Sequence, residues 1–286
     1  KMLDKLEVVD KPAEINDKMN IELNPSVISG NDVLSVSHLS KAFDDNTLFT
    51  DISFDIKRGE RVALIGNNGT GKTTILKIIN DILPADSGEI KLGSKVTIGY
   101  YDQEHHVLDP DKTLFDELQD AYPDLNNTQI RNTLAAFLFT NDDVFKYIRD
   151  LSGGERGRVS LAKLMLSNAN FLILDEPTNH LDMVSKEILE NALNSYTGTV
   201  LYVSHDRYFI NTTATRIIEL VGQTTVNYIG NYDYYIEKKD ALTAAALAGK
   251  PADSSSAVSA AQKNAQKESA KADWKQSKEE LSLIHI

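Results

Sequence analysis

The feature that most constrains this chain is a glycine-rich segment that joins two short apolar runs. Residues 61–65 (RVALI) have the composition of a short buried strand, and residues 75–79 (ILKII) that of the beginning of a helix. The connection between them contains Gly66, Gly69 and Gly71. Glycines allow consecutive backbone N–H groups to turn toward one centre, and the N-terminus of the following helix adds partial positive charge. The segment therefore predicts a backbone cradle for phosphate groups.

The same connection carries a lysine and hydroxyl side chains at fixed positions. It follows the pattern G-x-x-x-x-G-K-T, and a strand before it and a helix after it are the context in which this pattern predicts a P-loop. We expect Lys72 to pair with the β- and γ-phosphates and the Thr73 hydroxyl to ligate Mg²⁺. The alternative is an ordinary glycine-rich turn, but chance would produce the pattern in such a chain at only about the one per cent level. The predicted nucleotide-binding residues are Gly66, Asn67, Asn68, Gly69, Thr70, Gly71, Lys72, Thr73 and Thr74.

Composition excludes several other classes of protein. The chain has 286 residues, of which 41% are hydrophobic, enough for one large domain or two small ones, and no apolar run is long enough to span a bilayer. The formal net charge of −12 argues against a protein that coats nucleic acid without sequence preference. The absence of cysteine excludes disulfides and thiolate chemistry and fits a reducing compartment. The six histidines have no metal-site spacing.

The region before the P-loop predicts a small antiparallel sheet. Residues 33–38 alternate between apolar and polar side chains, residues 51–56 predict a second strand, and residues 41–46 between them predict a turn-rich loop. Phe43 lies in this loop and has two interpretations, stacking on a nucleobase or packing within the loop. The P-loop nearby favours stacking.

The remainder of the chain predicts an α/β fold. Residues 112–150 have helical periodicity and no strand candidate, with Leu114, Leu118 and Ala121 on one face, so we predict a helical insert at about residues 112–165. After the insert, strands alternate with helices, which is typical of an open, mostly parallel sheet covered on both faces. The predicted fold therefore combines a mostly parallel sheet core, an antiparallel β subdomain and a helical insert.

An acid pair follows a wholly apolar run. Residues 171–174 suit a strand buried on both faces, and Asp175 and Glu176 end it. Asp175 would reach Mg²⁺ through its water shell, and Glu176 would polarise the attacking water as a general base. The other interpretation of Glu176 is a carboxylate at the start of a helix. Gln103 follows another strand and would sense Mg²⁺ and the water, and His205, also after a strand, would hydrogen-bond the γ-phosphate.

Residues 151–155 (LSGGE) resemble the signature motif of ATP-binding-cassette (ABC) ATPases. The segment lies between Gln103, a candidate Q-loop glutamine, and the apolar run with its acid pair, which resembles a Walker B segment. The motifs occur in the order typical of that family and cover about residues 31–230. The resemblance implies a P-loop NTPase fold of the ABC type and ATP hydrolysis with ATP and Mg²⁺ as cofactors. It implies metal ligation by Thr73, Gln103 and Asp175, catalytic roles for Glu176, His205 and Gln103, and nucleotide contacts by Phe43, Ser152, Gly153, Gly154 and Asp182. Phe43 stands where the family often has tyrosine.

Residues 175–182 (DEPTNHLD) are similar to the ABC-F group of this family, in which two cassettes share one chain and many members act on the ribosome. The resemblance implies a cytoplasmic protein whose partners are a second ABC cassette and the ribosome with its tRNA, and no membrane span. By this interpretation residues 1–30 are the end of an interdomain linker and residues 31–238 form the ATPase domain. Residues 239–286 would then be a flexible linker and the beginning of a charged helix. The abrupt apolar ending at residues 281–286 suggests an artefactual end.

In the family, ATP is held between the P-loop of one cassette and the signature of another. Ser152 and Gly154 would therefore contact the γ-phosphate bound to a partner cassette, and we expect this chain alone to bind MgATP but hydrolyse it slowly. The runner-up function is the ATPase subunit of a membrane transporter. It is disfavoured by Asn179 and His180, where transporter ATPases more often have small residues. A chromosome- or repair-associated ATPase is a third interpretation, and the short spacing between Lys72 and Leu151 argues against it.

Overall fold

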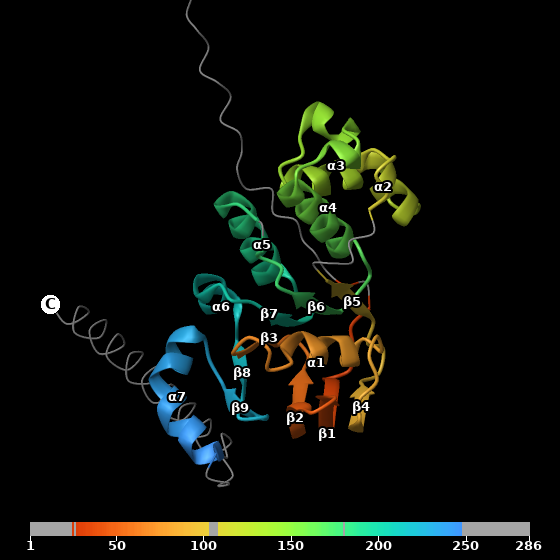
Figure 1. Ribbon diagram of the computed structural model, residues 1–286. Coiled ribbons are helices and arrows are strands. Elements are labelled where there is room, and N and C mark those ends of the chain that lie inside the picture. Colours follow the sequence, from red (N-terminus) through yellow and green to blue (C-terminus); the bar gives the residue numbers. More distant parts are fainter. Residues whose placement is uncertain (1–24, 26, 103–107, 180, 248–286) are drawn as a thin grey trace, which may run out of the picture.

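The fold consists of two β-sheets with helices between and around them (Figure 1). The computed structural model describes residue 25 and residues 27–102, 108–179 and 181–247. The strands in these ranges are β1 (Asp32–Phe43), β2 (Asn46–Lys57), β3 (Arg61–Gly66), β4 (Ser87–Leu92), β5 (Ile98–Tyr101), β6 (Phe171–Asp175), β7 (Thr199–Val203), β8 (Arg216–Val221) and β9 (Thr224–Tyr228). The helices are α1 (Lys72–Ile79), α2 (Leu114–Ala121), α3 (Asn127–Ala136), α4 (Gly153–Met165), α5 (Met183–Ser195), α6 (Arg207–Thr213) and α7 (Tyr232–Leu247), with 3₁₀ turns η1 (Asn141–Phe145) and η2 (Ile148–Asp150).

The larger sheet is mostly parallel. Its six strands lie in the order β5-β6-β7-β3-β8-β9, and every pairing is parallel except that of β8 with β9. The smaller sheet is antiparallel, with the order β2-β1-β4. These two sheets and the helices confirm the predicted α/β fold class.

Both faces of the larger sheet are buried, which explains its near-continuous apolar strands. On β3, Val62 and Leu64 pack in a core shared with α1 and the smaller sheet. Ala63 and Ile65 face the opposite way and join a second core with α4, α5 and α6. Figure 1 shows this layering, with α1 between the two sheets and α5 and α6 on the other side of the larger one.

The loop expected at residues 41–46 is mostly strand, so that part of the sequence interpretation was wrong. β1 continues to Phe43 and β2 begins at Asn46, and these two residues are paired across the hairpin. The turn needs only Asp44 and Asp45, because Asp44 adopts a left-handed conformation (φ 50°) that aspartate tolerates better than most residues. Phe43 therefore lies at the end of a strand rather than in a long loop.

A helical lobe formed by α2, α3, η1 and η2 packs against α4 (Figure 1). Leu114 and Leu118 of α2 are fully buried as predicted, whereas Ala121 is exposed. The sequence pattern missed Glu117, which is buried on the same helix because its Oε1 accepts a hydrogen bond from Lys163 Nζ of α4 at 2.6 Å. An ion pair across a helix interface has no local signature in either helix.

The first part of the segment expected to be flexible, residues 239–247, is the end of helix α7. The cause is a buried carboxylate on β8, Glu219, which accepts hydrogen bonds from Tyr235 at 2.8 Å and from Thr243 at 3.3 Å. Lys239 forms an ion pair with Glu219 at 3.2 Å. Alanines, which have high helix propensity, fill the rest of the last turns.

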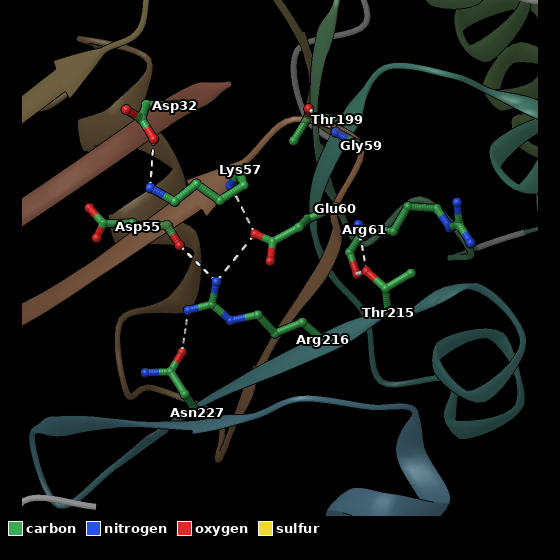
Figure 2. A network of polar contacts seen from close by, with 10 residues as sticks. All are labelled: Asp32, Asp55, Lys57, Gly59, Glu60, Arg61, Thr199, Thr215, Arg216 and Asn227. Atoms are coloured by element: carbon green, nitrogen blue, oxygen red, sulfur yellow. Dashed lines mark hydrogen bonds and ion pairs between the residues drawn. The ribbon is translucent and has the colours of Figure 1, made fainter. Parts of the chain in front are cut away.

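The end of the larger sheet at which β3 and β8 begin is closed by a polar network around Arg216 (Figure 2). The Arg216 guanidinium donates to the Asp55 carbonyl at 2.8 Å, to Glu60 Oε2 at 3.2 Å and to Asn227 Oδ1 at 2.7 Å. Glu60 Oε2 also accepts from the Lys57 N–H at 2.9 Å. This network ties β2 of the smaller sheet to β8 and β9 of the larger one.

Several sequence predictions lie outside the described residues. These are the linker at residues 1–24, the charged segment and the apolar ending within residues 248–286, and the side chains of Gln103 and His180. Within the described residues, no helix combines the length and hydropathy that a membrane span requires.

Candidate functional site

The candidate site lies at one edge of the larger sheet, where parallel strands end. β3 ends at Gly66, β6 at Asp175 and β7 at Val203. Since β7 pairs in parallel with both β3 and β6, these three ends meet at the same edge. Ligands of open α/β sheets bind in the crevice outside the carboxyl ends of such strands. The fold therefore brings together segments that are far apart in the sequence.

The predicted phosphate loop, residues 66–74, runs from the end of β3 into α1. Gly66 (φ 153°) lies so close to β8 that a Cβ there would meet the Leu220 carbonyl oxygen at 2.6 Å. Gly71 has a left-handed conformation (φ 102°), and a Cβ on it would come within 3.1 Å of the Phe49 ring. Gly71 is also the N-cap of α1 and provides no side chain to bond the first N–H groups of the helix. Those N–H groups are therefore available to an anion.

The other loop residues surround this turn. Asn67, Asn68 and Gly69 are exposed, and Thr70 Oγ1 donates to the Asn67 carbonyl at 2.9 Å. Thr74, in the first turn of α1, is half-buried. The middle of the loop therefore lies at the protein surface, where a ligand can reach it.

Lys72 is buried at the start of α1. Its Nζ donates to the carbonyl oxygens of Gly66 at 2.9 Å and Asn67 at 3.0 Å. Burial lowers the pKa of Lys72, and the negative charges of Glu176 and Asp175 oppose that effect. Lys72 is therefore a cation with neutral hydrogen-bond partners that lies in the field of two carboxylates.

Asp175 and Thr73 form the oxygen-rich part of the site. Thr73 Oγ1 donates to Asp175 Oδ1 at 3.2 Å. Burial raises the pKa of Asp175, and the Thr73 hydrogen bond partly offsets the shift. The charges of Asp102 and Glu176 raise this pKa further. A hydroxyl and a carboxylate are hard oxygen donors of the kind that Mg²⁺ prefers.

Asp102 was not among the residues singled out from the sequence. It is buried, directly follows β5, and has a carboxylate oxygen 4.0 Å from Lys77 Nζ. Asp102, like Asp175, stands at the carboxyl end of a parallel strand, but β5 is a partly buried edge strand and lacks the unbroken apolar run that marks Asp175. Within the described residues, no three histidine or acidic side chains form a metal cage.

Glu176 and His205 contact each other. Glu176 Oε1 lies 3.3 Å from His205 Nε2, and Glu176 Oε2 accepts from the His205 N–H at 3.3 Å. The backbone of Glu176 is left-handed (φ 48°), which is uncommon for a residue with a side chain, and its N–H donates to the Val203 carbonyl at 3.0 Å. Since α5 begins only at Met183, Glu176 is not a helix-start carboxylate. Local backbone strain of this kind persists where the surroundings impose it, and it is frequent at functional sites.

The signature residues lie at the start of α4. Ser152 is its N-cap and exchanges hydrogen bonds with Glu155: Ser152 N–H donates to Glu155 Oε2 at 2.8 Å, and Glu155 N–H donates to Ser152 Oγ at 3.3 Å. The hydrogen bond from Ser152 lowers the pKa of Glu155. Gly153 and Gly154 form the first turn of α4, and Ser152 and Gly153 are exposed. This capping box holds a helix N-terminus open toward the surface.

Asp182 and Phe43 complete the predicted set. Asp182 is the N-cap of α5, where it accepts from the Ser185 N–H at 2.7 Å and lies 3.6 Å from Arg158 of α4. Its contacts therefore join α5 to α4. Phe43 is 45% exposed, so it is not a core residue, and the Lys41 ammonium group lies 5.1 Å from its ring centroid.

Comparison with known proteins supports the same family as the motifs. Residues 49–179 match the family described as ABC transporter. The chain is 52% identical over 240 residues to YdiF of Bacillus subtilis, covering 84% of this chain and 37% of that protein. It is 39% identical over 238 residues to the energy-dependent translational throttle protein EttA of Escherichia coli, covering 81% of this chain and 43% of EttA. The chain thus spans less than half the length of these relatives.

The fold is also found among solved structures. The structure of cbiO1 from Clostridium perfringens, part of the ABC transporter complex cbiONQ, matches with a TM-score of 0.59 at 22% identity. The match covers 76% of this chain and 96% of cbiO1. At this identity the likeness concerns the fold alone.

Proposed function

Since this chain belongs to the ABC family of ATPases, we propose that it is a cassette that binds MgATP and hydrolyses it at the carboxyl edge of its larger sheet. One observation carries the proposal. Lys72, the Thr73–Asp175 pair and the Glu176–His205 pair come from separate segments and meet at this edge. These groups fit the binding of a triphosphate, the ligation of Mg²⁺ and the activation of water, respectively.

The binding step uses groups that the fold already holds in position. The N–H groups at the start of α1 and the Lys72 ammonium would bind phosphate oxygens. Thr73 and Asp175 would hold Mg²⁺, with Gln103 as a further ligand. When bound, Mg²⁺ neutralises charge on the phosphates and orients them.

The chemical step depends on Glu176. Its carboxylate would accept the proton of the attacking water, and the contact with His205 would keep the carboxylate oriented. His205 is exposed and would donate a hydrogen bond to the γ-phosphate.

We propose further that the cassette works with a second one. Ser152, Gly153 and Gly154 form a capped helix N-terminus at the surface, which suits contact with a γ-phosphate held by the partner. Asp182, at the start of the adjacent helix, would lie in the same interface. Because the chain covers only 37% of YdiF and 43% of EttA, the partner cassette could belong to the same polypeptide.

The ribosome is the partner that we propose for the whole protein, in the cytoplasm. The support is the similarity of residues 175–182 to the ABC-F group and the name of EttA, which describes a translational throttle. The transporter alternative has weaker support, because cbiO1 is only 22% identical to this chain.

The ATPase proposal is tested by turnover against protein concentration. If hydrolysis needs two cassettes, the rate of this chain alone should rise with the square of its concentration, while MgATP binding stays independent of concentration. Fast turnover proportional to concentration would contradict the composite site. The control is Lys91→Met, which alters an exposed lysine of β4 and should change neither quantity.

The ribosome proposal is tested by co-sedimentation. A two-cassette protein that contains this chain with Glu176→Gln should retain ATP and pellet with ribosomes in the presence of ATP but not ADP. Nucleotide-independent pelleting, or none, would count against the ribosome, and association with a membrane fraction would favour the transporter alternative.

A further inference from the structure

Asp86 lies in the connection between α1 and β4, and its carboxylate binds the last residues of β1. Asp86 Oδ1 accepts a hydrogen bond from Lys41 Nζ at 2.7 Å, and Oδ2 accepts from the Ala42 N–H at 2.7 Å. The Asp86 N–H donates in turn to the Ser40 carbonyl at 3.1 Å. The three residues directly before Phe43 are therefore all bonded to Asp86.

The lysine of this pair also lies against the Phe43 ring. Its Nζ is 5.1 Å from the ring centroid, and the Lys41 side chain is only 9% exposed. The ring itself is 45% exposed. A cation is attracted to the face of an aromatic ring by the ring quadrupole. Lys41 thus covers one face of Phe43 and leaves the rest of the ring accessible.

Stability alone does not account for a lysine at this position. The Lys41 side chain is only 9% exposed whereas that of Asp86 is 47% exposed, and an ion pair often does little more than offset the hydration that its buried member loses. β1 has a fully buried leucine two residues earlier, at Leu39. The presence of a lysine at position 41 is therefore better explained if Lys41 positions the residues next to it.

The strand end that carries Phe43 lies beside the phosphate loop. Lys41 is paired with Phe49 across the hairpin, and the Phe49 ring lies against Gly71, at the start of α1. On the other side, the backbone carbonyl of Gln223, in the β8–β9 turn, accepts from the Thr50 N–H at 3.0 Å. The hairpin is therefore held between the phosphate loop and the β8–β9 turn.

We propose that Lys41 and Asp86 are positioning residues that present one face of Phe43 to a purine base. The ion pair fixes the end of β1, and the ammonium group occupies the inner face of the ring, so that a base stacks on the outer face. The inference rests on the proposed nucleotide site, because it requires the base of the bound nucleotide to reach Phe43. Phosphate contacts are made by other residues and do not depend on this pair.

The test compares a ligand with a base and a ligand without one. Dissociation constants of MgATP and of magnesium tripolyphosphate are measured by competition against a fluorescent ATP analogue. Phe43→Ala should weaken MgATP binding about tenfold and leave tripolyphosphate unchanged, since stacking on an aromatic ring contributes on this scale. Lys41→Met and Asp86→Asn should weaken MgATP binding about two- to fivefold with the same selectivity. Lys41→Arg keeps the cation and should restore most of the loss.

The matched control is Lys57→Met, which removes an exposed ion pair with Asp32 near the other end of the same sheet and should alter neither ligand. If Phe43→Ala weakens MgATP but Lys41→Met and Asp86→Asn do not, the positioning role is overturned and the nucleotide site stands. Equal losses for both ligands in Lys41→Met would mean that the pair only supports the fold, which also overturns it. If Phe43→Ala leaves the affinity for MgATP unchanged, the base does not stack on Phe43 and the inference is overturned. Binding of tripolyphosphate tests the phosphate loop separately. Should Lys41→Met not fold, Asp86→Asn provides the same comparison.

Discussion

Two polar clusters lie at opposite ends of the same six-stranded sheet, and they differ in how their charges are compensated. At the end where the strands begin, Arg216 bonds the carboxylate of Glu60, the side chain of Asn227 and a backbone carbonyl (Figure 2). At the end where the strands finish, Lys72 bonds two backbone carbonyls, and Asp175 bonds the Thr73 hydroxyl. In the first cluster the opposite charges of Arg216 and Glu60 bond each other directly. In the second cluster Lys72 and Asp175 each bond a neutral group instead.

The difference separates a structural network from a site that is arranged for a ligand. In a paired network each charged group already has its partner, so the network has little left to offer to a charged molecule, and removing one member leaves the other without its partner. Carboxylates close to one another, such as Asp175 and Glu176, cost stability unless a cation reaches them. Substitutions should therefore impair stability at one end of the sheet and function at the other.

The largest effect is expected at Glu176. Glu176→Gln keeps the shape of the side chain but removes the base, so ATP turnover should fall by about 100-fold or more while MgATP binding persists. Single-turnover hydrolysis measures the first quantity and equilibrium binding the second. Glu187→Gln, an exposed glutamate of α5, is the matched control. Equal turnover of Glu176→Gln and the parent would remove Glu176 from the mechanism.

Lys72 should come next. Lys72→Met removes the cation from the phosphate cradle and should weaken MgATP binding by roughly 10- to 100-fold, on the scale of a charge-assisted hydrogen bond. The midpoint of thermal unfolding without nucleotide should change little, because the loss of two hydrogen bonds is offset by the removal of a charge whose burial lowers the Lys72 pKa. A large loss of stability with unchanged MgATP binding would show instead that Lys72 stabilises the fold and does not bind the nucleotide.

Arg216 should show the opposite pattern, with a loss of stability and no change in MgATP binding. Arg216→Met removes the donor to Glu60, Asn227 and the Asp55 carbonyl and leaves Glu60 with the Lys57 N–H alone, so it should lower the free energy of unfolding by about 1–3 kcal/mol, with MgATP affinity unchanged. Urea unfolding measures the first and competition binding the second. The control is Arg149→Met, whose ion pair with Asp111 is exposed and should contribute little. Loss of MgATP affinity in Arg216→Met would show that the two ends of the sheet are coupled.

The smallest effect concerns the pH dependence of stability. Burial raises the pKa of Asp175 above its usual 3.8, so the folded chain binds this proton more tightly than the unfolded chain does. The ionised carboxylate therefore destabilises the fold at neutral pH. Asp175→Asn should raise the unfolding midpoint at pH 7 in the absence of Mg²⁺ and nucleotide. The advantage should shrink as the pH falls through the raised pKa toward 3.8.

Asp182 provides a control with the opposite sign. Hydrogen bonds from Ser185 lower the pKa of Asp182 below 3.8, so its charge stabilises the fold above that value. That contribution is lost as the pH falls through the lowered pKa. Asp182→Asn should therefore gain no stability at pH 7, and a gain equal to that of Asp175→Asn would contradict the role given to burial.

The parts of the molecule that could be predicted from the sequence are those with local signatures. The phosphate loop is encoded by glycines and a lysine within nine residues, and the buried strand before Asp175 by its unbroken apolar run. The capping box of Ser152 and Glu155 is likewise a pattern of neighbouring residues. Each of these depends on backbone conformation or burial that a short segment determines by itself.

The parts that could not be predicted depend on pairs distant in sequence. Lys41 and Asp86 are far apart in the chain, as are Glu117 and Lys163, and nothing local to either member marks the contact. The helical continuation to Leu247 depends on Glu219, a charged residue within a strand that otherwise reads as core. The strand end at Phe43 was missed because aspartates suggest a loop, although two of them suffice for the turn.

The two hydrogen bonds from Lys72 to the carbonyls of Gly66 and Asn67 have a thermodynamic consequence. They curl the loop around the ammonium group as part of folding, so the conformational entropy of those residues is lost when the chain folds. When a phosphate binds, the backbone N–H donors of the loop are therefore already arranged around its position. The affinity of this loop for phosphate should therefore change little when remote parts of the protein become more rigid.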